Sequence, residues 1–374
     1  MLIKKFLLLI SFLSLFNLMY SQKENCSINW DQETAKKVCD GVYGRIKKLN
    51  TGDFALVYSK GNSVYFRKSK DKCITWSDEV FVDGNNKNYN YTNSELIQLS
   101  NGTLFYCWNG RVVNQGGNDN YLIMYSLSYD YGNSWEKSKI IYEGGNSFEN
   151  GCWEPCALEL PNGTIQVYFA NEAPYINSNE QEITMIESKD KCKTWNKPVT
   201  VSFREKHRDG MPVAIYLKES KTIALAIEDN GIDGLFKPAV ISIKPDWTDL
   251  PIDGERNERE VCLKNENKLK SDVYAGAPYI IKIPNNRTLL SFQSTENREG
   301  ENEKFAIMQV YIGDSNCHNF CNKTTPFENI PKNGSALWNS LCLIDNNTVI
   351  AVSSFSKNHN GDGVWTVRGN IGGK

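Results

Sequence analysis

An eight-residue motif recurs three times at almost constant spacing, and this repeat constrains the fold more than any other feature of the chain. The motif reads SKDKCITW from Ser69, SYDYGNSW from Ser128 and SKDKCKTW from Ser188, so successive copies begin 59 and 60 residues apart. A degraded fourth copy spans Ser242 to Trp247. Similarity at a fixed period of this kind is typical of proteins assembled from repeated structural units.

The residue types in the motif predict a hairpin with a fixed turn. Its aspartate carboxylate accepts hydrogen bonds from the amides of the turn, and its tryptophan packs beneath the hairpin. The fifth position favours a left-handed backbone and therefore glycine. Cys73 and Cys192 stand where the second copy has Gly132. If the three turns are alike, each cysteine should carry about 1 kcal/mol of backbone strain.

Hairpin turns of a second kind count the structural units. Each is a short polar turn between two apolar segments, as with Leu96–Leu99 before one turn and Thr103–Tyr106 after it. This pattern predicts the turn that joins the first two strands of a unit. The six turns lie at Asn50–Gly52, Ser100–Gly102, Pro161–Gly163, Lys218–Ser220, Pro284–Asn286 and Asp345–Asn347.

Six units of this kind predict an all-β fold, a six-bladed β-propeller with four-stranded antiparallel blades. Length alone would suggest two domains. Because the turns and the eight-residue motifs keep one period, we expect residues 22–374 to form a single propeller domain.

The N-terminus predicts secretion. Lys4 and Lys5 precede a mostly apolar run that ends near Tyr20, which is typical of a signal peptide over residues 1–21 and too short for a membrane anchor. A secreted chain can form disulfides, and among its 11 cysteines the local candidates are Cys152 with Cys156 and Cys317 with Cys321. A eukaryotic secretory pathway would also glycosylate sequons, which lie at Asn25, Asn90, Asn101, Asn162, Asn286, Asn322, Asn333 and Asn346.

Composition excludes several classes of function. The net charge is −2 with no basic block, so we expect no nucleic-acid partner. No later apolar stretch is long enough for a membrane span, and we expect an extracellular monomer. The chain has no CxxC pair and its three histidines lie far apart in sequence, so we expect no metal and no cofactor. Aromatic residues make up 11% of the chain, which suits packed sheets or a sugar-binding surface.

The strand order of a blade predicts which face binds a ligand. We label the strands A to D from the centre outward. The hairpin turns join A to B and the eight-residue motifs join C to D, so both lie on one face. The starts of the A strands and the ends of the B strands meet on the other face, at the mouth of the central channel. Candidate residues collected there are Arg45, Glu95, Trp108, Trp153, Glu154, Glu172, Gln181, Arg208, Asp209, Glu228, Tyr279 and Trp338.

Arginines, carboxylates and aromatic rings on one rim suit a carbohydrate ligand. Aromatic rings stack on sugar rings, while charged groups form hydrogen bonds with hydroxyls. The alternative for any one glutamate is a solvated loop end. Glu172 and Glu228 are stronger candidates because each closes an apolar B strand, at equivalent places in neighbouring blades.

These features resemble those of Asp-box propellers, also called BNR-repeat propellers, which include the sialidases and the exo-arabinanases of glycoside hydrolase family 93. The eight-residue motif is the Asp-box, which specifies the superfamily. The blade pattern that goes with it covers nearly the whole chain after the predicted signal peptide. Resemblance to family 93 rests on about 80 residues, from Trp153-Glu154-Pro155 through Phe169-Ala-Asn-Glu172 to Ile227-Glu228-Asp229.

The resemblance implies a retaining exo-α-1,5-L-arabinanase that cleaves polysaccharide ends with two glutamates. Glu172 would match the general acid/base and Glu228 the nucleophile, with Glu154 as the rival for the first role. Such a pair needs one protonated and one ionised carboxyl group, the latter held by a cation such as Arg208 or Arg45. The remaining candidates would bind the substrate: Arg45, Glu95, Trp108, Trp153, Gln181, Arg208, Asp209, Tyr279 and Trp338.

Two alternatives stay open. Sialidases resemble one another in a three-arginine clamp on the substrate carboxylate, and Arg45 and Arg208 could provide two of its members. Blade five reads Tyr274-Ala-Gly-Ala-Pro-Tyr279 where a further arginine would be expected, although Arg256, Arg259 and Arg298 lie in polar loops that could reach inward. A non-catalytic glycan-binding propeller is the other alternative, because a fold does not dictate a function.

Overall fold

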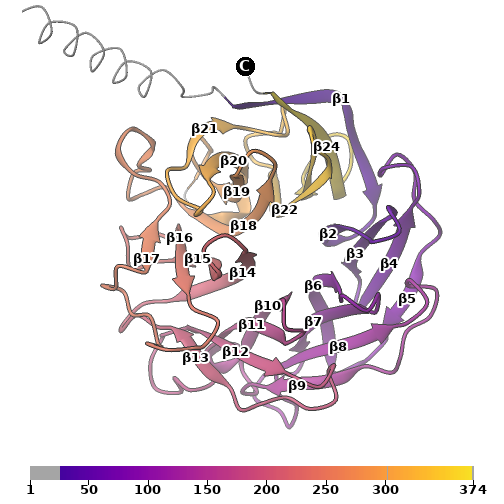
Figure 1. Cartoon of the computed structure of the whole chain (residues 1–374), viewed down its shortest axis with the longest axis vertical. Coiled ribbons are helices and arrows are strands. Elements are labelled where there is room, and N and C mark those ends of the chain that lie inside the picture. The colour runs from indigo at the N-terminus through magenta and orange to yellow at the C-terminus, as the bar shows by residue number, and fades with distance from the viewer. Residues whose placement is uncertain (1–25, 301, 373–374) are drawn as a thin grey trace, which may run out of the picture.

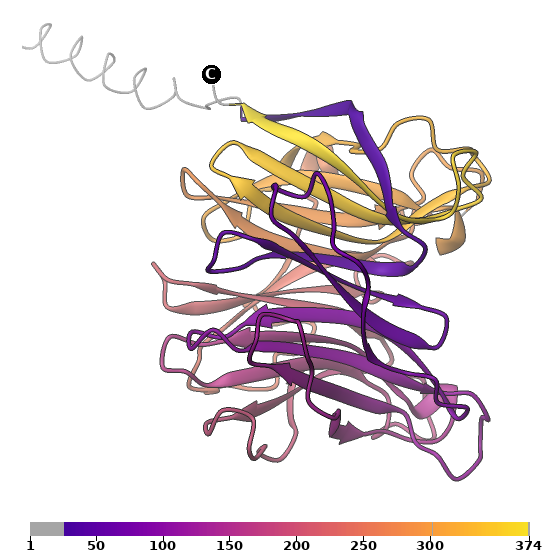
Figure 2. The same cartoon turned by 90° about the vertical axis from the view of Figure 1, so that its right-hand side faces the viewer.

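The computed structural model describes residues 26–300 and 302–372, which form six four-stranded antiparallel sheets arranged radially around one axis (Figure 1). The predicted six-bladed propeller is therefore confirmed. In the side view of Figure 2 the strands run across the ring, from one face towards the other. The predicted signal peptide lies outside the described residues.

Five blades follow the chain, each with its A strand innermost. Blade 1 contains β2 (Val42–Lys48), β3 (Phe54–Lys60), β4 (Ser63–Ser69) and β5 (Val80–Asp83). Blade 2 contains β6 (Tyr89–Gln98), β7 (Leu104–Val112), β8 (Leu122–Ser128) and β9 (Lys139–Glu143). Blade 3 contains β10 (Cys152–Glu159), β11 (Ile165–Asn171), β12 (Glu182–Ser188) and β13 (Val199–Ser202). Blade 4 contains β14 (Asp209–Leu217), β15 (Thr222–Asp229), β16 (Lys237–Ile243) and β17 (Arg259–Val261). Blade 5 contains β18 (Ala275–Ile283), β19 (Arg287–Ser294), β20 (Ile307–Asp314) and β21 (Cys321–Thr324).

Blade 6 closes the ring with both ends of the described chain. Its inner strands are β22 (Ser335–Asp345), β23 (Thr348–Ser356) and β24 (Gly363–Gly372), and its outermost strand is β1 (Ser27–Cys39) from the start of the chain. The pairing of β1 with β24 begins at Ser27 opposite Gly372 (Figure 1). It joins the first and last strands by hydrogen bonds, and the sequence pattern did not predict it.

Short 3-10 turns are the remaining regular elements: η1 (Phe148–Asn150), η2 (Asn265–Asn267) and η3 (Glu303–Phe305). Among the described residues no helix has the length and apolar character needed to cross a membrane. The expected local disulfides are not formed in the structure. Cys152, Cys156, Cys317 and Cys321 are all free thiols.

Burial of the middle strands explains their apolar sequences. Every residue of β11 and β12 is buried, because neighbouring blades pack on both faces of the sheet. Their apolar residues fill the contacts between blades, and their buried polar side chains form hydrogen bonds, as when Asn171 Nδ2 donates to Thr184 Oγ1 at 3.0 Å. The short outer strand β13 is only partly buried. Five of the six predicted A–B turns lie between the strands that they were expected to join, and the sixth begins at Asp345, the last residue of β22.

The three Asp-boxes form one hairpin geometry at the C–D turns of blades 1 to 3. In the first copy Asp71 Oδ1 accepts a hydrogen bond from the amide of Thr75 at 2.8 Å. The fifth position is left-handed in all three, with φ of 66° at Cys73, 86° at Gly132 and 64° at Cys192. Both cysteine side chains are buried, and this apolar burial offsets part of the strain.

The degraded fourth copy adopts a different turn. Asp246 accepts from the amide of Thr248, two residues further along, and not from the fourth residue as in the three intact copies.

A β-bulge interrupts the same place in all six A strands, and the residue at each bulge has φ between 46° and 60°. A left-handed backbone destabilises a residue other than glycine by about 1–2 kcal/mol, and such strain gathers at functional sites. Four of these residues pack together where the A strands meet. We call the set the bulge ring, and its members in chain order are Tyr43, Asn93, Glu154, Met211, Ala277 and Trp338.

Candidate active site

A cavity of about 680 Å³ opens at the bulge ring, on the face opposite the Asp-boxes. Its volume falls within the range of small-molecule sites in proteins. Residues from blades 2 to 6 and from the loops between their strands line it. They are Arg111, Phe148, Trp153, Glu154, Glu172, Gln181, Arg208, Met211, Leu235, Phe236, Glu228, Tyr274, Asn302, Glu303 and Trp338.

Glu228 lies near the end of β15 and is 8% exposed. Its Oε2 accepts a hydrogen bond from the amide of Ala277 at 2.7 Å. Two glycines make room for it: a Cβ at Gly276 would meet Oε2 at 2.3 Å, and a Cβ at Gly210 would meet Oε1 at 2.8 Å. Burial and the negative charge of Glu154 together raise the pKa of Glu228 to about 8, although the hydrogen bond from the Ala277 amide acts in the opposite direction. The pair that Glu228 forms with Glu154 therefore holds at least one proton near neutral pH.

Glu154 is the one carboxylate of the bulge ring. Burial raises its pKa to about 7, while the positive charge of Arg111 opposes the shift. Arg111 Nη2 lies 3.3 Å from Glu154 Oε1 and donates to Asn93 Oδ1 at 2.7 Å. The guanidinium also lies over the ring of Trp153, 4.9 Å from its centroid. Glu154 is thus placed to exchange a proton within the cavity.

Glu172 follows β11 and is held as part of an ion pair. Arg208 Nη2 donates to a Glu172 oxygen and also to Gln181 Oε1 at 2.5 Å. Burial raises the pKa of Glu172, but the charge and the hydrogen bond of Arg208 act in the opposite direction. Because Arg208 stabilises the ionised form, Glu172 is less suited than Glu154 to donate a proton.

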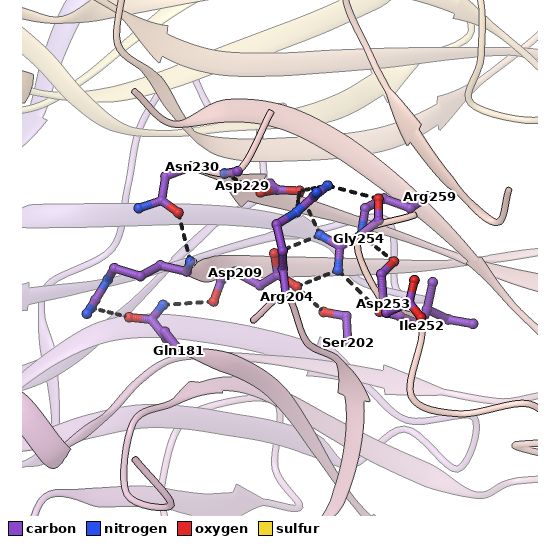
Figure 3. Close-up of polar contacts among 12 residues, drawn as sticks. Gln181, Ser202, Arg204, Asp209, Asp229, Asn230, Ile252, Asp253, Gly254 and Arg259 are labelled. Carbon is purple, nitrogen blue, oxygen red and sulfur yellow. Dashed lines mark hydrogen bonds and ion pairs between the residues drawn. The ribbon is translucent and has the colours of Figure 1, made fainter. Parts of the chain in front are cut away.

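Arg204, Asp209, Asp229 and Arg259 form a buried ion cluster next to the cavity residues in sequence (Figure 3). Asp209 and Asp229 are paired residues of β14 and β15, and both are fully buried. The guanidinium of Arg259 donates to Asp209 Oδ2 at 2.6 Å and to Asp229 Oδ2 at 2.8 Å. Arg204 adds a second contact with Asp229 Oδ2, at 3.0 Å. Since each aspartate already has an arginine partner, Arg208 is left to face the cavity.

Two further contacts connect this cluster to the cavity wall. Ser202, at the end of β13, donates to Asp209 Oδ2 at 2.8 Å and so ties blade 3 to blade 4. The side-chain amide of Gln181 donates to the carbonyl of Asp209 at 2.9 Å. The cluster therefore fixes the chain on both sides of Arg208. It also holds the strand end that carries Glu228, because Asp229 is the next residue.

The structure brings seven of the twelve predicted site residues to the cavity. They include all three candidate catalytic glutamates, and their chemical roles remain predictions. The seven are Trp153, Glu154, Glu172, Gln181, Arg208, Glu228 and Trp338.

Arg45, Glu95 and Tyr279 do not line the cavity, which corrects their predicted contact with substrate. Each lies two residues after a member of the bulge ring, so its side chain points into the channel beneath that ring. Arg45 Nε lies 3.5 Å from Glu95 Oε2, and its guanidinium lies 5.1 Å from the centroid of the Tyr279 ring. Lys47 completes this channel cluster with contacts of 2.7 Å to Glu95 and to the Tyr279 hydroxyl.

Two more predicted contacts are corrected. Trp108 is fully buried in the core cluster between blades 1 and 2, against Tyr91 and Tyr106. Asp209 is a member of the buried ion cluster and has no exposed surface. Neither side chain can reach a ligand in the cavity.

Sequence reasoning gave no role to several lining residues. Met211 carried a signal: like Glu154 and Ala277, it is a bulge-ring residue followed by a proline. Phe148, Leu235, Phe236, Asn302 and Glu303 lie in loops between strands, whose paths no periodic pattern specifies.

Four of the five arginines considered for a sialidase-type clamp are engaged outside the cavity. Arg45 is buried in the channel, and Arg259 belongs to the buried ion cluster. Arg256 pairs with Glu258 at 3.0 Å, and Arg298 donates to backbone carbonyls, including that of Gly334 at 2.8 Å. The described lining of the cavity contains two arginines, Arg111 and Arg208, and each contacts a glutamate.

Fold and site together define a class: an Asp-box propeller with a cavity lined by carboxylates at one end of its channel. Residues 49–226 match the BNR repeat-like domain family. No curated protein sequence matches the chain significantly. The family match and the structural similarities below confirm the resemblance to Asp-box propellers.

Several solved structures share the fold. An α-L-arabinofuranosidase of Fusarium graminearum, solved with an iminosugar inhibitor, has a TM-score of 0.69 at 17% identity, over 93% of this chain and 98% of that one. An α-L-arabinanase of Penicillium chrysogenum, solved with arabinobiose, has a TM-score of 0.66 at 15% identity, over 92% and 97%. A sialidase of Streptococcus pneumoniae has a TM-score of 0.56 at 12% identity, over 90% of this chain and 69% of the other.

Proposed function

We propose that this chain is a secreted retaining glycoside hydrolase that cleaves arabinan or a related neutral polysaccharide from its end. The observation that carries the proposal is the pair formed by Glu154 and Glu228. Both line one cavity, and burial raises their pKa values to about 7 and about 8. A retaining glycosidase uses two carboxyl groups that share one proton in the reactive state.

In this mechanism Glu228 is the nucleophile and Glu154 the general acid/base. Because the two groups interact, they lose their protons in two steps that belong to the pair. After the first loss the pair shares one proton, and in the reactive form Glu154 carries it for the leaving group while Glu228 is the carboxylate that attacks. Positive charge that develops on the cleaved sugar favours the ionised form at Glu228, which the Ala277 amide also stabilises.

Glu172 has a different part in the proposal from the one that the sequence resemblance implied. Its contact with Arg208 favours the ionised form, against the effect of burial. We assign it, with Gln181 and Arg208, to binding sugar hydroxyls. Both cavity arginines contact glutamates, so neither is free to bind an anionic sugar, and this favours a neutral substrate over a sialoside.

The test is product analysis on linear arabinan, arabinoxylan and aryl sialosides with the purified protein. We expect arabinose or a short arabinooligosaccharide, with the anomeric configuration of the first product retained. Glu228→Gln and Glu154→Gln should each lower kcat at least a hundredfold, whereas Glu172→Gln should mainly raise KM. Glu136→Gln, on the opposite face, is the matched control. Full activity of both Glu228→Gln and Glu154→Gln would refute the assignment, and release of sialic acid would replace the substrate.

Secretion is part of the same proposal and rests on the predicted signal peptide over residues 1–21. Expression of the whole chain followed by N-terminal sequencing of protein from the medium tests it. A mature chain that begins near Gln22 is the expected result, and retention of Met1 on protein inside the cell would contradict it.

A further inference from the structure

The two sides of the cavity have different chemistry, and this gives the site a direction. Glu228 lies on the side of blades 4 and 5, where Gly210 and Ala277 surround it. Glu154 lies on the side of blades 2 and 3, in contact with Arg111. In a retaining mechanism the nucleophile attacks the sugar that is cleaved, and the acid/base lies beside the leaving group. The leaving group should therefore point towards blades 2 and 3.

Phe148 stands at the cavity on this side. It begins η1 between blades 2 and 3, lines the cavity and is 58% exposed. Its ring lies 4.9 Å from that of Trp153, which directly precedes Glu154. Behind it Trp153 is buried and contacts Tyr121, with 4.7 Å between ring centroids. Phe148 thus packs, at an interplanar angle of 54°, against a tryptophan that is itself fixed by burial.

Hydrogen bonds hold the loop that presents Phe148. The amide of Gly145 donates to the carbonyl of Asn150 at 2.7 Å, which closes the loop around η1. The amide of Ser147, next to Phe148, donates to Asn150 Oδ1 at 2.9 Å. The loop is also bonded to the B–C loop of blade 2, where the amide of Tyr121 donates to the carbonyl of Gly145 at 2.8 Å. An exposed aromatic ring on a preorganised loop at a cavity is a feature of binding sites.

Other exposed apolar residues do not share this setting. Val113 and Ile176 lie in the B–C loops of blades 2 and 3 and are 56% and 72% exposed. Neither lines the cavity. Phe148 is therefore distinguished by its position and not by its exposure alone.

We infer that Phe148 forms the leaving-group subsite, where its ring stacks on the apolar face of the second sugar of a neutral oligosaccharide. The inference rests on the proposed function for its direction. It goes further by naming the residue that makes the enzyme prefer oligosaccharides to substrates with a small leaving group. Aromatic stacking of this kind supports about a tenfold difference in kcat/KM.

The experiment compares Phe148→Ala with the wild-type protein on two substrates. One is arabinotriose, and the other is α-L-arabinofuranosyl fluoride, whose leaving group is a single atom that cannot stack. We expect kcat/KM to fall about tenfold on arabinotriose and to change less than twofold on the fluoride. Phe148→Tyr should restore most of the loss, and Ile176→Ala is the matched control on the same face. No loss on arabinotriose, or equal loss on both substrates, would overturn the inference.

Binding separates this inference from the proposed function. Trp153 lies against Phe148, so its fluorescence should respond when arabinotriose is titrated into the wild-type protein. If the protein cleaves neither substrate, the proposed function fails. The subsite is then decided by the titration: at least fivefold weaker binding by Phe148→Ala supports it, and an unchanged Kd or no binding at all overturns it.

Discussion

Glu228 should lower the stability of the fold at high pH, and replacing it with glutamine should remove this effect. The pKa of Glu228 is about 8 in the folded protein, against an ordinary value near 4.5. Between these values the folded state binds more protons at this site than the unfolded state. The free energy of unfolding therefore falls as the pH rises through this window, since stability falls wherever the folded state binds more protons.

The magnitude follows from the same two values. One pKa unit corresponds to about 1.4 kcal/mol, so the full effect of ionising Glu228 is about 5 kcal/mol. Under 1 kcal/mol of this is present at pH 5, and nearly all of it at pH 9. Between pH 5 and pH 9 the free energy of unfolding of Glu228→Gln should therefore rise by about 4 kcal/mol relative to that of the wild-type protein. The glutamine oxygen can still accept from the amide of Ala277.

Urea denaturation at pH 5, 7 and 9, with equal slopes for both proteins, measures the effect. The control is Glu205→Gln, which makes the same chemical change in a side chain that is 77% exposed. If the curves of Glu228→Gln and wild-type protein stay parallel from pH 5 to pH 9, Glu228 is not a buried, protonated carboxyl group. The acid/base pair of the proposed mechanism would then lose its physical basis.

Three substitutions test other features. Gly276→Ala should lower kcat at least tenfold with little change in Tm. Its Cβ would lie 2.3 Å from both Glu228 Oε2 and the Tyr274 hydroxyl. An unchanged kcat would show that Glu228 has room to move. Gly132→Ala should destabilise the fold by about 2–4 kcal/mol in urea denaturation, since its Cβ would lie 2.3 Å from the Phe66 ring at a φ of 86°; equal stability would contradict this. Arg259→Met should destabilise by about 3–5 kcal/mol, and adding Asp209→Asn should recover part of the loss; strictly additive losses would mean that the ion cluster does not act as a unit.

The sequence predicted the fold because its signals are local. An Asp-box and an A–B turn each specify a hairpin from a few adjacent residues, and their common period counts the blades. The three candidate glutamates were found for a similar reason, since Glu172 and Glu228 end apolar B strands and Glu154 begins an A strand. Closure by β1 was missed because its partner lies at the other end of the chain.

The errors in the site have one main cause, which is the bulge in every A strand. Arg45, Glu95 and Tyr279 were placed at the ligand face by counting residues from the strand start. Each bulge inserts an extra residue, so these side chains point into the channel beneath the cavity. The ion cluster was hidden for another reason: Arg259 is 50 residues from Asp209 in sequence, and no local pattern connects them.

The bulge ring shows how a sixfold fold produces an asymmetric site. Its six members share one backbone conformation, so only their side chains can distinguish the blades. In blades 1, 4, 5 and 6 these are Tyr43, Met211, Ala277 and Trp338, which pack together into an apolar floor.

In blades 2 and 3 the ring members are Asn93 and Glu154, which Arg111 bridges through contacts of 2.7 and 3.3 Å. The single carboxylate of the ring thus lies at the boundary between an apolar floor and a polar wall. Burial against that floor raises the pKa of Glu154, and the neighbouring arginine keeps the shift moderate. The ring residues of blades 3 and 5 share this backbone conformation, so an exchange of their side chains would move the carboxylate from Arg111 to the side of Glu228. The chemistry of the site therefore depends on which blade carries the glutamate, while the fold does not.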